Sequence, residues 1–478
     1  MGIRLEDPVV NNVNLTVDPL AIDESPVKRV LGMNDMYQDT AQPTKEQQRH
    51  IEELFGKLES EASRSFHKIV KAVEDGDPSL QLTRGERNRI RKFLFLLKYR
   101  GSGFHRRYSG SIDAAGYDYD DQEQLREYMR ERGFERRVDV WFDNIKTFAN
   151  LKMDAENKWM AELLDKVYPA DARWLINHVQ QMYMAICTPA DASDEFTLTD
   201  DSYNVFEGVE KVMRDPETGR LKGHEWINFH EFAPVSPKVM IVLRTCAVPV
   251  SEEDVDSEDE EASDLWQKAV VDHFGPSTES SLADLPICKA RNSYSQVIDG
   301  RAIMDNEDRA KQLDDKFYFT FFRFSTHHVD RINGFLLDNA HNCTRIVFQS
   351  RNSFQKTLEW YMTEPCQYGK RIVGADAEAK LKLLKGLAGL LRSMGSSAKP
   401  VWDESFISIN GALSDSEKKR LGSEKFKEII ESHFKSQSDG QSRNMSQQPD
   451  IMLKYASLGI LYVLPISDTI LTNFYRRL

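Results

Sequence analysis

The segment LTRGERNRIRKFLFLLKY, residues 82–99, predicts a helix and sets the helical character of the N-terminal half. Thr83 is a suitable N-cap, and Glu86 stands three residues later, so the two form a capping-box sequence. Apolar residues then recur at helical spacings: Ile90, Phe93, Leu94 and Leu97. A Gly-Ser-Gly run at 101–103 ends the pattern. The segment therefore predicts an amphipathic helix from Thr83 to about residue 100.

The flanking sequence predicts more helices before this segment and a change of period after it. A longer amphipathic helix is expected from Lys45 to about Glu74, and further helices over 121–165. Strands are favoured by alternation or by β-branched residues in three segments: 174–186, 195–200 and 238–245. Later elements are expected at 325–342 (helix), 344–350 (strand), 353–362, 375–394 and 415–435 (helices). We expect an α+β fold with a helical N-terminal half, a small central β-sheet and a helical C-terminal cover.

The composition is that of a globular protein. The 478 residues are 40% hydrophobic and 10% aromatic, enough to bury a sizeable core. We expect one large α+β domain over 1–435, with a mobile acidic loop at 251–264 inside it. A polar linker is expected at 436–450, and an apolar helical segment at 451–478 should pack back on the domain.

The sequence carries no pattern typical of export or membrane insertion. No apolar run reaches the roughly 18 residues of a membrane span, and no secretory-signal pattern opens the chain. The five cysteines are scattered without a Cys-x-x-Cys pair, so neither a disulfide framework nor a zinc ribbon is indicated. We therefore expect a cytoplasmic protein with no membrane partner.

The net charge of −13 is distributed very unevenly along the chain. Residues 251–264 carry nine acidic residues and no basic one, so the rest of the chain has a net charge of −13 + 9 = −4. Residues 84–107 carry nine Lys or Arg against one Glu, a local charge of +8. The acidic average therefore does not exclude a nucleic-acid partner for the basic segment.

The basic segment is the first candidate site. Helical spacing places Arg84, Arg87, Arg91 and Lys98 near one face, and Arg100, His105, Arg106 and Arg107 follow in the glycine-rich turn. A face of one sign suits a phosphate backbone, because each neutralised phosphate releases a counterion. The alternative is the ordinary charged face of a solvated amphipathic helix.

The second candidate is FTLTDDSYNVFEG, residues 196–208, in which a strand ends in acidic residues. If Ser202 and Asn204 make a turn there, three carboxylates can converge: Asp200, Asp201 and Glu207. Such a cluster could hold a metal, act as a general base, or bind a guanidinium group. Tyr203 lies in the same turn. The alternative, which the spacing alone favours, is an Asx-turn with solvated acids.

Two further residues are weaker candidates. Ser236 lies in HEFAPVSPKVMIVLR, residues 230–244, where two prolines predict a rigid extended entry to a strand. It lacks the Gly-x-Ser-x-Gly context of a hydrolase nucleophile. Asn333-Gly334, within a helical pattern, indicates close packing, although Asn333 could also reach a site.

The order of several motifs resembles a family of unknown function that is found in bacteria and is abundant in fungi. The resemblance covers roughly residues 25–365 and rests on motifs that include FTLTDDSYNVFEG, FAPVSPKVMIVLR and VDRINGFLLDNAHNCTRIVFQS. Within the fungal branch, the pattern is similar to arginine-containing cyclodipeptide synthases, with which we associate an Asp-Asp-x-x-Glu motif. Here Asp200-Asp201-Ser202-Tyr203 is followed by Asn204, and the family's opening His-Tyr-x-Pro segment is absent.

This resemblance implies a tRNA-dependent synthase that condenses arginine with a second amino acid. Its partners would be arginyl-tRNA and a second aminoacyl-tRNA, with no cofactor and no metal. It implies catalytic roles for Asp200, Asp201 and Glu207. The substrate-binding residues would be Arg91, Lys98, Arg100, His105, Arg106, Tyr203, Ser236 and Asn333. The alternatives are a metal-dependent nuclease that uses the same acids, and a non-catalytic RNA-binding or interaction protein.

Overall fold

A computed structural model describes most of the chain up to residue 403. The described residues are 9–27, 30, 44–101, 107–108, 122–214, 221–246, 274, 279–298, 301–306, 309–365, 369–372 and 377–403. The expected acidic loop at 251–264, the helix at 415–435, the linker and the C-terminal apolar segment lie outside them. So do His105 and Arg106. No helix among the described residues is long and apolar enough to span a membrane.

The N-terminal half is a helical bundle, as the sequence predicted. Its helices are α1 (Lys45–Glu74), α2 (Arg84–Tyr99), α4 (Gln122–Arg132), α5 (Arg137–Asn150), α6 (Trp159–Lys166) and α7 (Pro169–Gln180). Large aromatic side chains fill the centre of this bundle, among them Trp141, Phe148 and Trp159. The bundle therefore has a core of its own, separate from the sheet that follows.

Helix α2 begins with the predicted capping box. The Thr83 hydroxyl accepts from the Glu86 amide at 3.2 Å, and the Glu86 carboxylate accepts from the Thr83 amide at 2.7 Å. These two bonds satisfy donors that a helix start leaves open. Ile90 and Leu94 pack toward the sheet, while Phe95 and Tyr99 pack into the bundle. The helix is thus buried on two sides and lies between both cores.

A seven-stranded sheet forms the centre of the molecule. Its order is β3 (Ser79–Thr83), β12 (Lys316–Phe324), β4 (Met182–Pro189), β8 (Val239–Thr245), β7 (Leu221–Ser236) and β6 (Phe206–Arg214), and the short β9 (Arg291–Asn292) also pairs with β12. The β12–β4 pair is parallel and the other pairs are antiparallel. The strand expected at 238–245 corresponds to β8.

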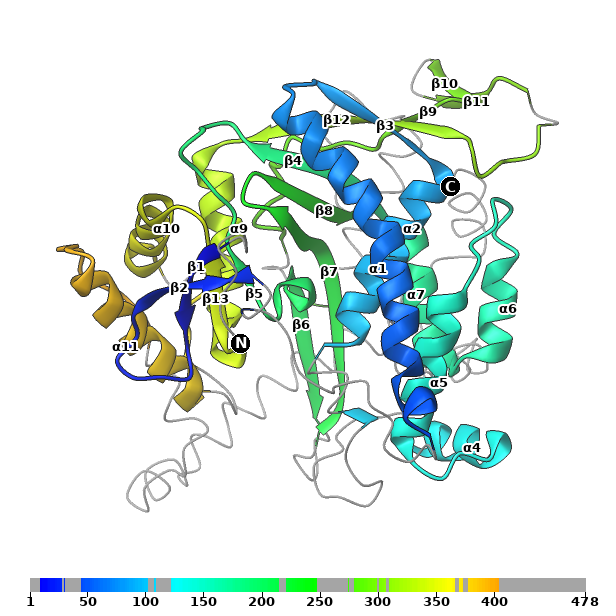
Figure 1. Ribbon diagram of the computed structural model, residues 1–478, viewed down its shortest axis with the longest axis horizontal. Helices are drawn as coiled ribbons and strands as arrows, with labels where there is room; N and C mark the ends of the chain where they lie inside the picture. The colour runs from blue at the N-terminus through cyan, green and yellow to red at the C-terminus, as the bar shows by residue number, and fades with distance from the viewer. Residues whose placement is uncertain are drawn as a thin grey trace, which may run out of the picture.

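The two faces of this sheet pack against different helices. Alternation along β4 places Met184 and Ile186 in the core shared with α1 and α2, and Ala185 and Cys187 in the core shared with α9 (Thr326–Asn339). Figure 1 shows α1 and α2 on one side of the sheet and α9 on the other. Strand β7 follows the same rule at its centre: His230 and Glu231 are neighbours in sequence and point to opposite faces.

A C-terminal unit packs against the α9 side. A four-stranded sheet has the order β2 (Ile22–Pro26), β1 (Val9–Asn14), β13 (Arg345–Phe348) and β5 (Leu198–Thr199). Helices α10 (Arg351–Thr363) and α11 (Ala377–Ser393) cover it with a leucine-rich core. The remaining elements are η2 (Ser202–Asn204), η4 (Ala340–Asn342) and the hairpin β10 (Ser295–Ile298) with β11 (Arg301–Met304). The α+β class and the three-part arrangement are confirmed.

Two strand predictions are wrong in their extent. The strand expected over 174–186 starts only at Met182, because α7 continues to Gln180. Pro169 at the first helical turn favours this helix, and its buried side chains follow helical spacings, among them Trp174, Leu175 and His178. The segment 195–200 forms a strand only at Leu198–Thr199.

Candidate functional site

Three arginines of α2 turn inward and line a cavity. The cavity has a volume of about 170 Å³ and lies between α2, β4, β12 and the segment that carries β9. Arg84, Arg87 and Arg91 face it from α2, and Lys289 and Lys311 contribute from other segments. The three arginines share one face as predicted, but Lys98, which was predicted on the same face, does not line the cavity. The face is not an open surface, however, because the sheet and the 289–294 segment close over it.

Each arginine is held by a different set of groups. Arg84 donates to the Asp315 carboxylate at 3.1 Å and to the carbonyl of Gln312 at 3.0 Å. The Arg87 guanidinium stacks over the Phe317 ring at 4.0 Å. Arg91 donates from its two Nη atoms to the carbonyls of Val179 and Met182, each at 2.5 Å.

The cavity carries positive charge without a matching acid. Among the described residues, only Arg84 of these five cations has a carboxylate within ion-pair distance. Burial lowers the pKa of Arg91 to about 10, and burial together with Arg91 and Arg84 lowers the pKa of Arg87 well below its usual value. Such shifts mean that the charged forms lack compensation. An anion in the cavity would supply it.

Lys98, expected to contact phosphates, lies in a buried ion pair instead. Its Nζ lies 2.6 Å from Oε1 of Glu231, and the two side chains are 8% and 7% exposed. Asn228 donates to the same carboxylate at 2.8 Å, and Nδ1 of His178 lies 3.3 Å from it. Burial alone would raise the pKa of Glu231, but Lys98 and His178 lower it below its usual value.

Arg91 and Lys98 therefore do not lie on an exposed face of α2, where the sequence predicted their phosphate contacts. Arg91 is 6% exposed and binds backbone carbonyls, and Lys98 is neutralised by an acid 133 residues away. Helical spacing shows which side chains share a face, but it cannot show which tertiary element covers that face. Arg100, two residues after Lys98, is half-buried at the C-cap of α2 and stacks over the Phe55 ring at 5.2 Å.

The acidic turn lies directly against the end of α2. A Cβ on Gly101 would come within 2.0 Å of Nδ2 of Asn204, so the backbone approaches η2 more closely than any side chain would allow. The hydroxyl of Tyr203 donates to the carbonyl of Pro234 at 3.0 Å. Burial raises the pKa of Tyr203 to about 12. The positive charge of Arg100 lies close enough to the Tyr203 hydroxyl to lower this pKa. Two predicted candidate segments, about 100 residues apart in sequence, therefore meet here.

The three predicted carboxylates do not converge on one point. Asp200 is exposed and accepts from the amide and hydroxyl of Thr344 at 2.9 and 2.8 Å, which ties β5 to the start of β13. Asp201 accepts from Nδ2 of Asn204 at 2.5 Å, within its own turn. Glu207 is buried on the next strand. No group of three potential metal ligands occurs among the described residues, so the metal-binding option for these acids has no support there.

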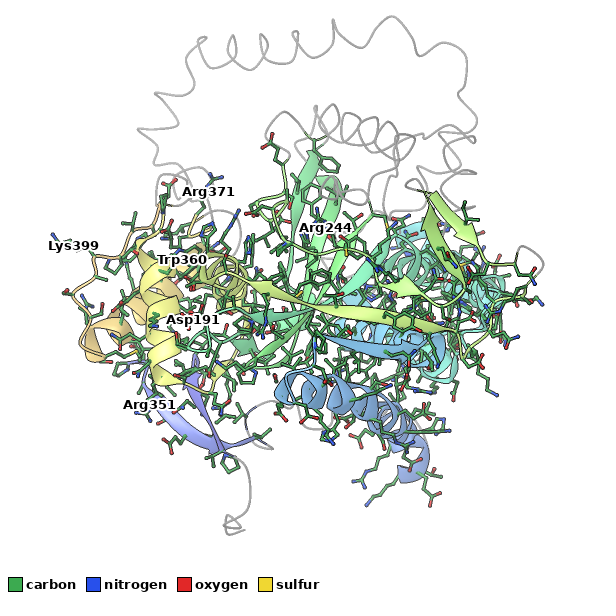
Figure 2. The ribbon with its side chains drawn as sticks, turned by 90° about the horizontal axis from the view of Figure 1, so that it is seen from above. Asp191, Arg244, Arg351, Trp360, Arg371 and Lys399 are labelled. Atoms are coloured by element: carbon green, nitrogen blue, oxygen red, sulfur yellow. The ribbon has the colours of Figure 1, made fainter. Side chains whose placement is uncertain are left out.

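Glu207 belongs to a buried polar group on the α9 side of the sheet. Its carboxylate lies 2.9 Å from Nδ1 of His230 and accepts from Ser280 Oγ at 3.0 Å and from the Ser281 amide at 2.7 Å. Burial lowers the pKa of His230, so the ring is neutral and its Nδ1–H donates to Glu207. Arg244, opposite His230 on β8, lies in the interior of the molecule (Figure 2). Ser280 lies beside the same ring nitrogen as Glu207, which is not the arrangement of a catalytic triad.

Ser236 and Asn333 have structural contacts. Ser236 Oγ accepts from the amide of Lys238 at 3.2 Å in the turn between β7 and β8. Asn333 is fully buried on α9, where its amide group accepts from Thr197 N at 3.0 Å and donates to Glu195 O at 2.8 Å. Asn333 thus fixes the segment that leads into β5, in agreement with the close-packing interpretation.

Sequence reasoning missed Glu231, His230 and His178. One signal was present: HEFAPVSPKVMIVLR opens with two adjacent titratable residues in an otherwise apolar strand. Such residues must find partners when a strand is buried on both faces. The partners themselves, on α2, α7 and β6, have no signature in the local sequence.

Comparisons with known proteins give a family and no activity. A family model described as "Protein of unknown function (DUF4238)" matches residues 5–352, well over half of the chain. No curated protein and no solved structure matches. The matched range includes α2, the acidic turn, both buried polar groups and the cavity. The chain belongs to the DUF4238 family.

Proposed function

We propose that this chain is a tRNA-dependent cyclodipeptide synthase that condenses arginine with a second amino acid in the cytoplasm. The observation that carries the proposal is the contact between the end of α2 and the acidic turn, at Gly101 and Asn204. A synthase of this kind needs cations for the acceptor end of tRNA beside carboxylates for an ammonium or guanidinium group. The motif resemblance to arginine-containing cyclodipeptide synthases supplies the activity.

The reaction needs no external energy source, because the aminoacyl ester is already activated. The α-amine of one aminoacyl group attacks the ester carbonyl of the other, which forms an amide, breaks the ester C–O bond and returns the proton to the released tRNA hydroxyl. The free α-amine of the dipeptidyl-tRNA then attacks its own ester, closes the six-membered ring and releases the second tRNA. The protein contributes positioning, proton transfer and stabilisation of the oxyanion.

We propose roles for these residues that differ from those implied by the motif alone. Arg100 directly precedes Gly101 at this contact and would bind the acceptor end. Asp201, half-buried at the start of η2, would contact the ammonium or guanidinium group. Asp200 and Glu207 would be positioning residues, because both are occupied by hydrogen bonds to other elements.

The nuclease alternative has no comparable support. A two-metal or one-metal nuclease requires several acidic or histidine ligands at one point, and the described residues hold no such group. A non-catalytic RNA-binding protein would use the same cations, and the product assay separates it from the synthase.

The test is formation of a cyclic dipeptide by the purified full-length chain. It is incubated with arginyl-tRNA and a pool of other aminoacyl-tRNAs, with and without EDTA, and the products are analysed by mass spectrometry. We expect an arginine-containing cyclic dipeptide whose yield EDTA does not change. Asp201→Asn should abolish it, and Asp165→Asn, an exposed acid on α6, is the matched control and should not. Folded wild-type protein that releases no product from charged tRNA would refute the proposal.

A further inference from the structure

We infer that the cavity beside α2 is a binding site for a phosphate group, held by Arg87, Arg91, Lys289 and Lys311. This inference does not rest on the proposed synthase activity, because it concerns a different part of α2 and a ligand defined by its charge. The cavity lies toward the N-terminal half of the helix, whereas the acidic turn contacts its C-terminal end.

The first argument is uncompensated charge. None of the four cations has a carboxylate within ion-pair distance in the part of the chain that the structure describes. Arg91 is only 6% exposed, and its Nε has no hydrogen-bond partner among the described residues. A buried guanidinium that keeps its charge needs either an anion or a full set of acceptors. Its two carbonyl partners leave that set incomplete.

The second argument is that the guanidinium groups are already fixed. Phe317 supports Arg87 from one side at 4.0 Å, and Arg84 lies 5.2 Å from the Tyr294 ring while it pairs with Asp315. Planar guanidinium forks suit phosphate because they donate two parallel hydrogen bonds. Groups held in place before the ligand arrives lose little conformational entropy on binding it.

The third argument is size. At about 30 Å³ per water molecule, a cavity of about 170 Å³ has room for a phosphate group and a few waters. A continuous nucleic-acid strand cannot pass through that volume. Lys289 is exposed and Lys311 half-buried, so they form the outer rim, while Arg91 lies at the base. The ligand is therefore a terminal or free phosphate and not a backbone phosphate within a strand.

The test is titration of the full-length protein with inorganic phosphate, followed by thermal unfolding and by isothermal calorimetry at constant ionic strength. Phosphate should raise the midpoint temperature in a saturable way, and chloride at equal ionic strength should not. Lys289→Met and Lys311→Met should each weaken binding about tenfold, and Arg87→Met should remove it. Lys385→Met, an exposed lysine on α11, is the matched control and should bind as the wild type does.

Further arms identify the source of the phosphate. A 5′-mononucleotide that binds at least tenfold more tightly than inorganic phosphate assigns the site to a nucleotide, and equal affinities assign it to free phosphate. Competition by uncharged tRNA assigns it to an RNA end. If Arg87→Met does not fold, the two lysine variants decide. Equal phosphate binding by wild type, Lys289→Met and Lys311→Met, or no saturable binding by the wild type, would overturn the inference.

Discussion

Replacing Lys98 by methionine tests whether the basic helix is turned inward as described. Lys98 and Glu231 are more than nine-tenths buried and their charged atoms are 2.6 Å apart. Removing one partner of such a pair leaves an uncompensated buried charge, which costs about 3–5 kcal/mol. Asn228 and His178 remain beside Glu231 but cannot replace a full positive charge. We expect Lys98→Met to lower the free energy of unfolding by that amount at pH 8.

The double variant separates loss of a charge pair from loss of packing. Glu231→Gln alone leaves the Lys98 ammonium buried without a carboxylate partner among the described residues, beside the Trp174 and Phe206 rings at 5.3 and 5.8 Å from its Nζ. Lys98→Met combined with Glu231→Gln leaves no buried charge, so most of the stability should return. The two single effects should therefore be strongly non-additive, with a coupling of about 2 kcal/mol or more.

The dependence on pH follows from the direction of the pKa shift. Because the folded-state pKa of Glu231 is lowered, the pair stabilises the wild type above the unfolded pKa of about 4.3, and this is lost as the pH falls further. Without Lys98, burial raises the pKa of Glu231, so the deficit of the variant should shrink between pH 8 and pH 5. Urea unfolding, followed by tryptophan fluorescence, measures the coupling between the two single variants and the change of the Lys98→Met deficit with pH. Additive single effects, or a deficit that does not change with pH, would refute the ion-pair assignment.

Four further predictions concern separate parts of the molecule. Asp330→Asn should raise the midpoint temperature by about 2 °C at pH 8 and by less at pH 5, measured by scanning calorimetry. Burial first, and then Asp194, raises the pKa of Asp330 to about 7, so its ionised form destabilises the fold as the pH rises. Gly101→Ala should displace Asn204 and reduce cyclic-dipeptide yield at least tenfold, whereas Gly56→Ala, in open space on α1, should not. Asp200→Asn should lower the free energy of unfolding in urea by about 1 kcal/mol and keep most of the cyclic-dipeptide yield, because an amide oxygen can still accept from Thr344. Complete loss of product would instead indicate that Asp200 has a catalytic role. Deleting 251–264, on its charge alone, should tighten RNA binding at low salt and change the midpoint temperature by less than about 2 °C, and a large loss of stability would contradict this.

The parts of the fold that depend on local signals could be predicted from the sequence. The capping box at Thr83 and Glu86 and the stripe of α1 involve residues three or four positions apart, so pattern alone locates them. The long hairpin of β6 and β7 was not predicted, because no strand signal was recognised in Phe206–Arg214 or in the first part of β7. Helix α7 was also missed, because five of the seven even positions of 174–186 are apolar and this alternation was interpreted as a strand.

The candidate site divides in the same way. The clustering of Arg84, Arg87 and Arg91 follows from helical periodicity, and the structure confirms it. The burial of Lys98 depends on Glu231, which the chain brings back only after α7 and three strands. Asp200 and Asn333 were predicted as candidate site residues, but their hydrogen bonds hold β5 between β13 and α9. The sequence identified these polar residues as candidates, but it could not show whether their role is catalytic or structural.

The alternation of His230 and Glu231 on β7 has a consequence for how the sheet assembles. Glu231 meets a lysine on one face, and the neutral His230 donates to Glu207 on the other. A shift of β7 by one residue in one direction would bring Glu231 opposite Glu207 and turn Phe232 toward Lys98. A shift in the other direction would turn His230 toward Lys98 and move Glu231 away from it. Either alignment buries Lys98 without its carboxylate partner, which destabilises the misaligned sheet. The adjacent residues His230 and Glu231 therefore favour the native register of β7 electrostatically, whether or not either residue takes part in catalysis.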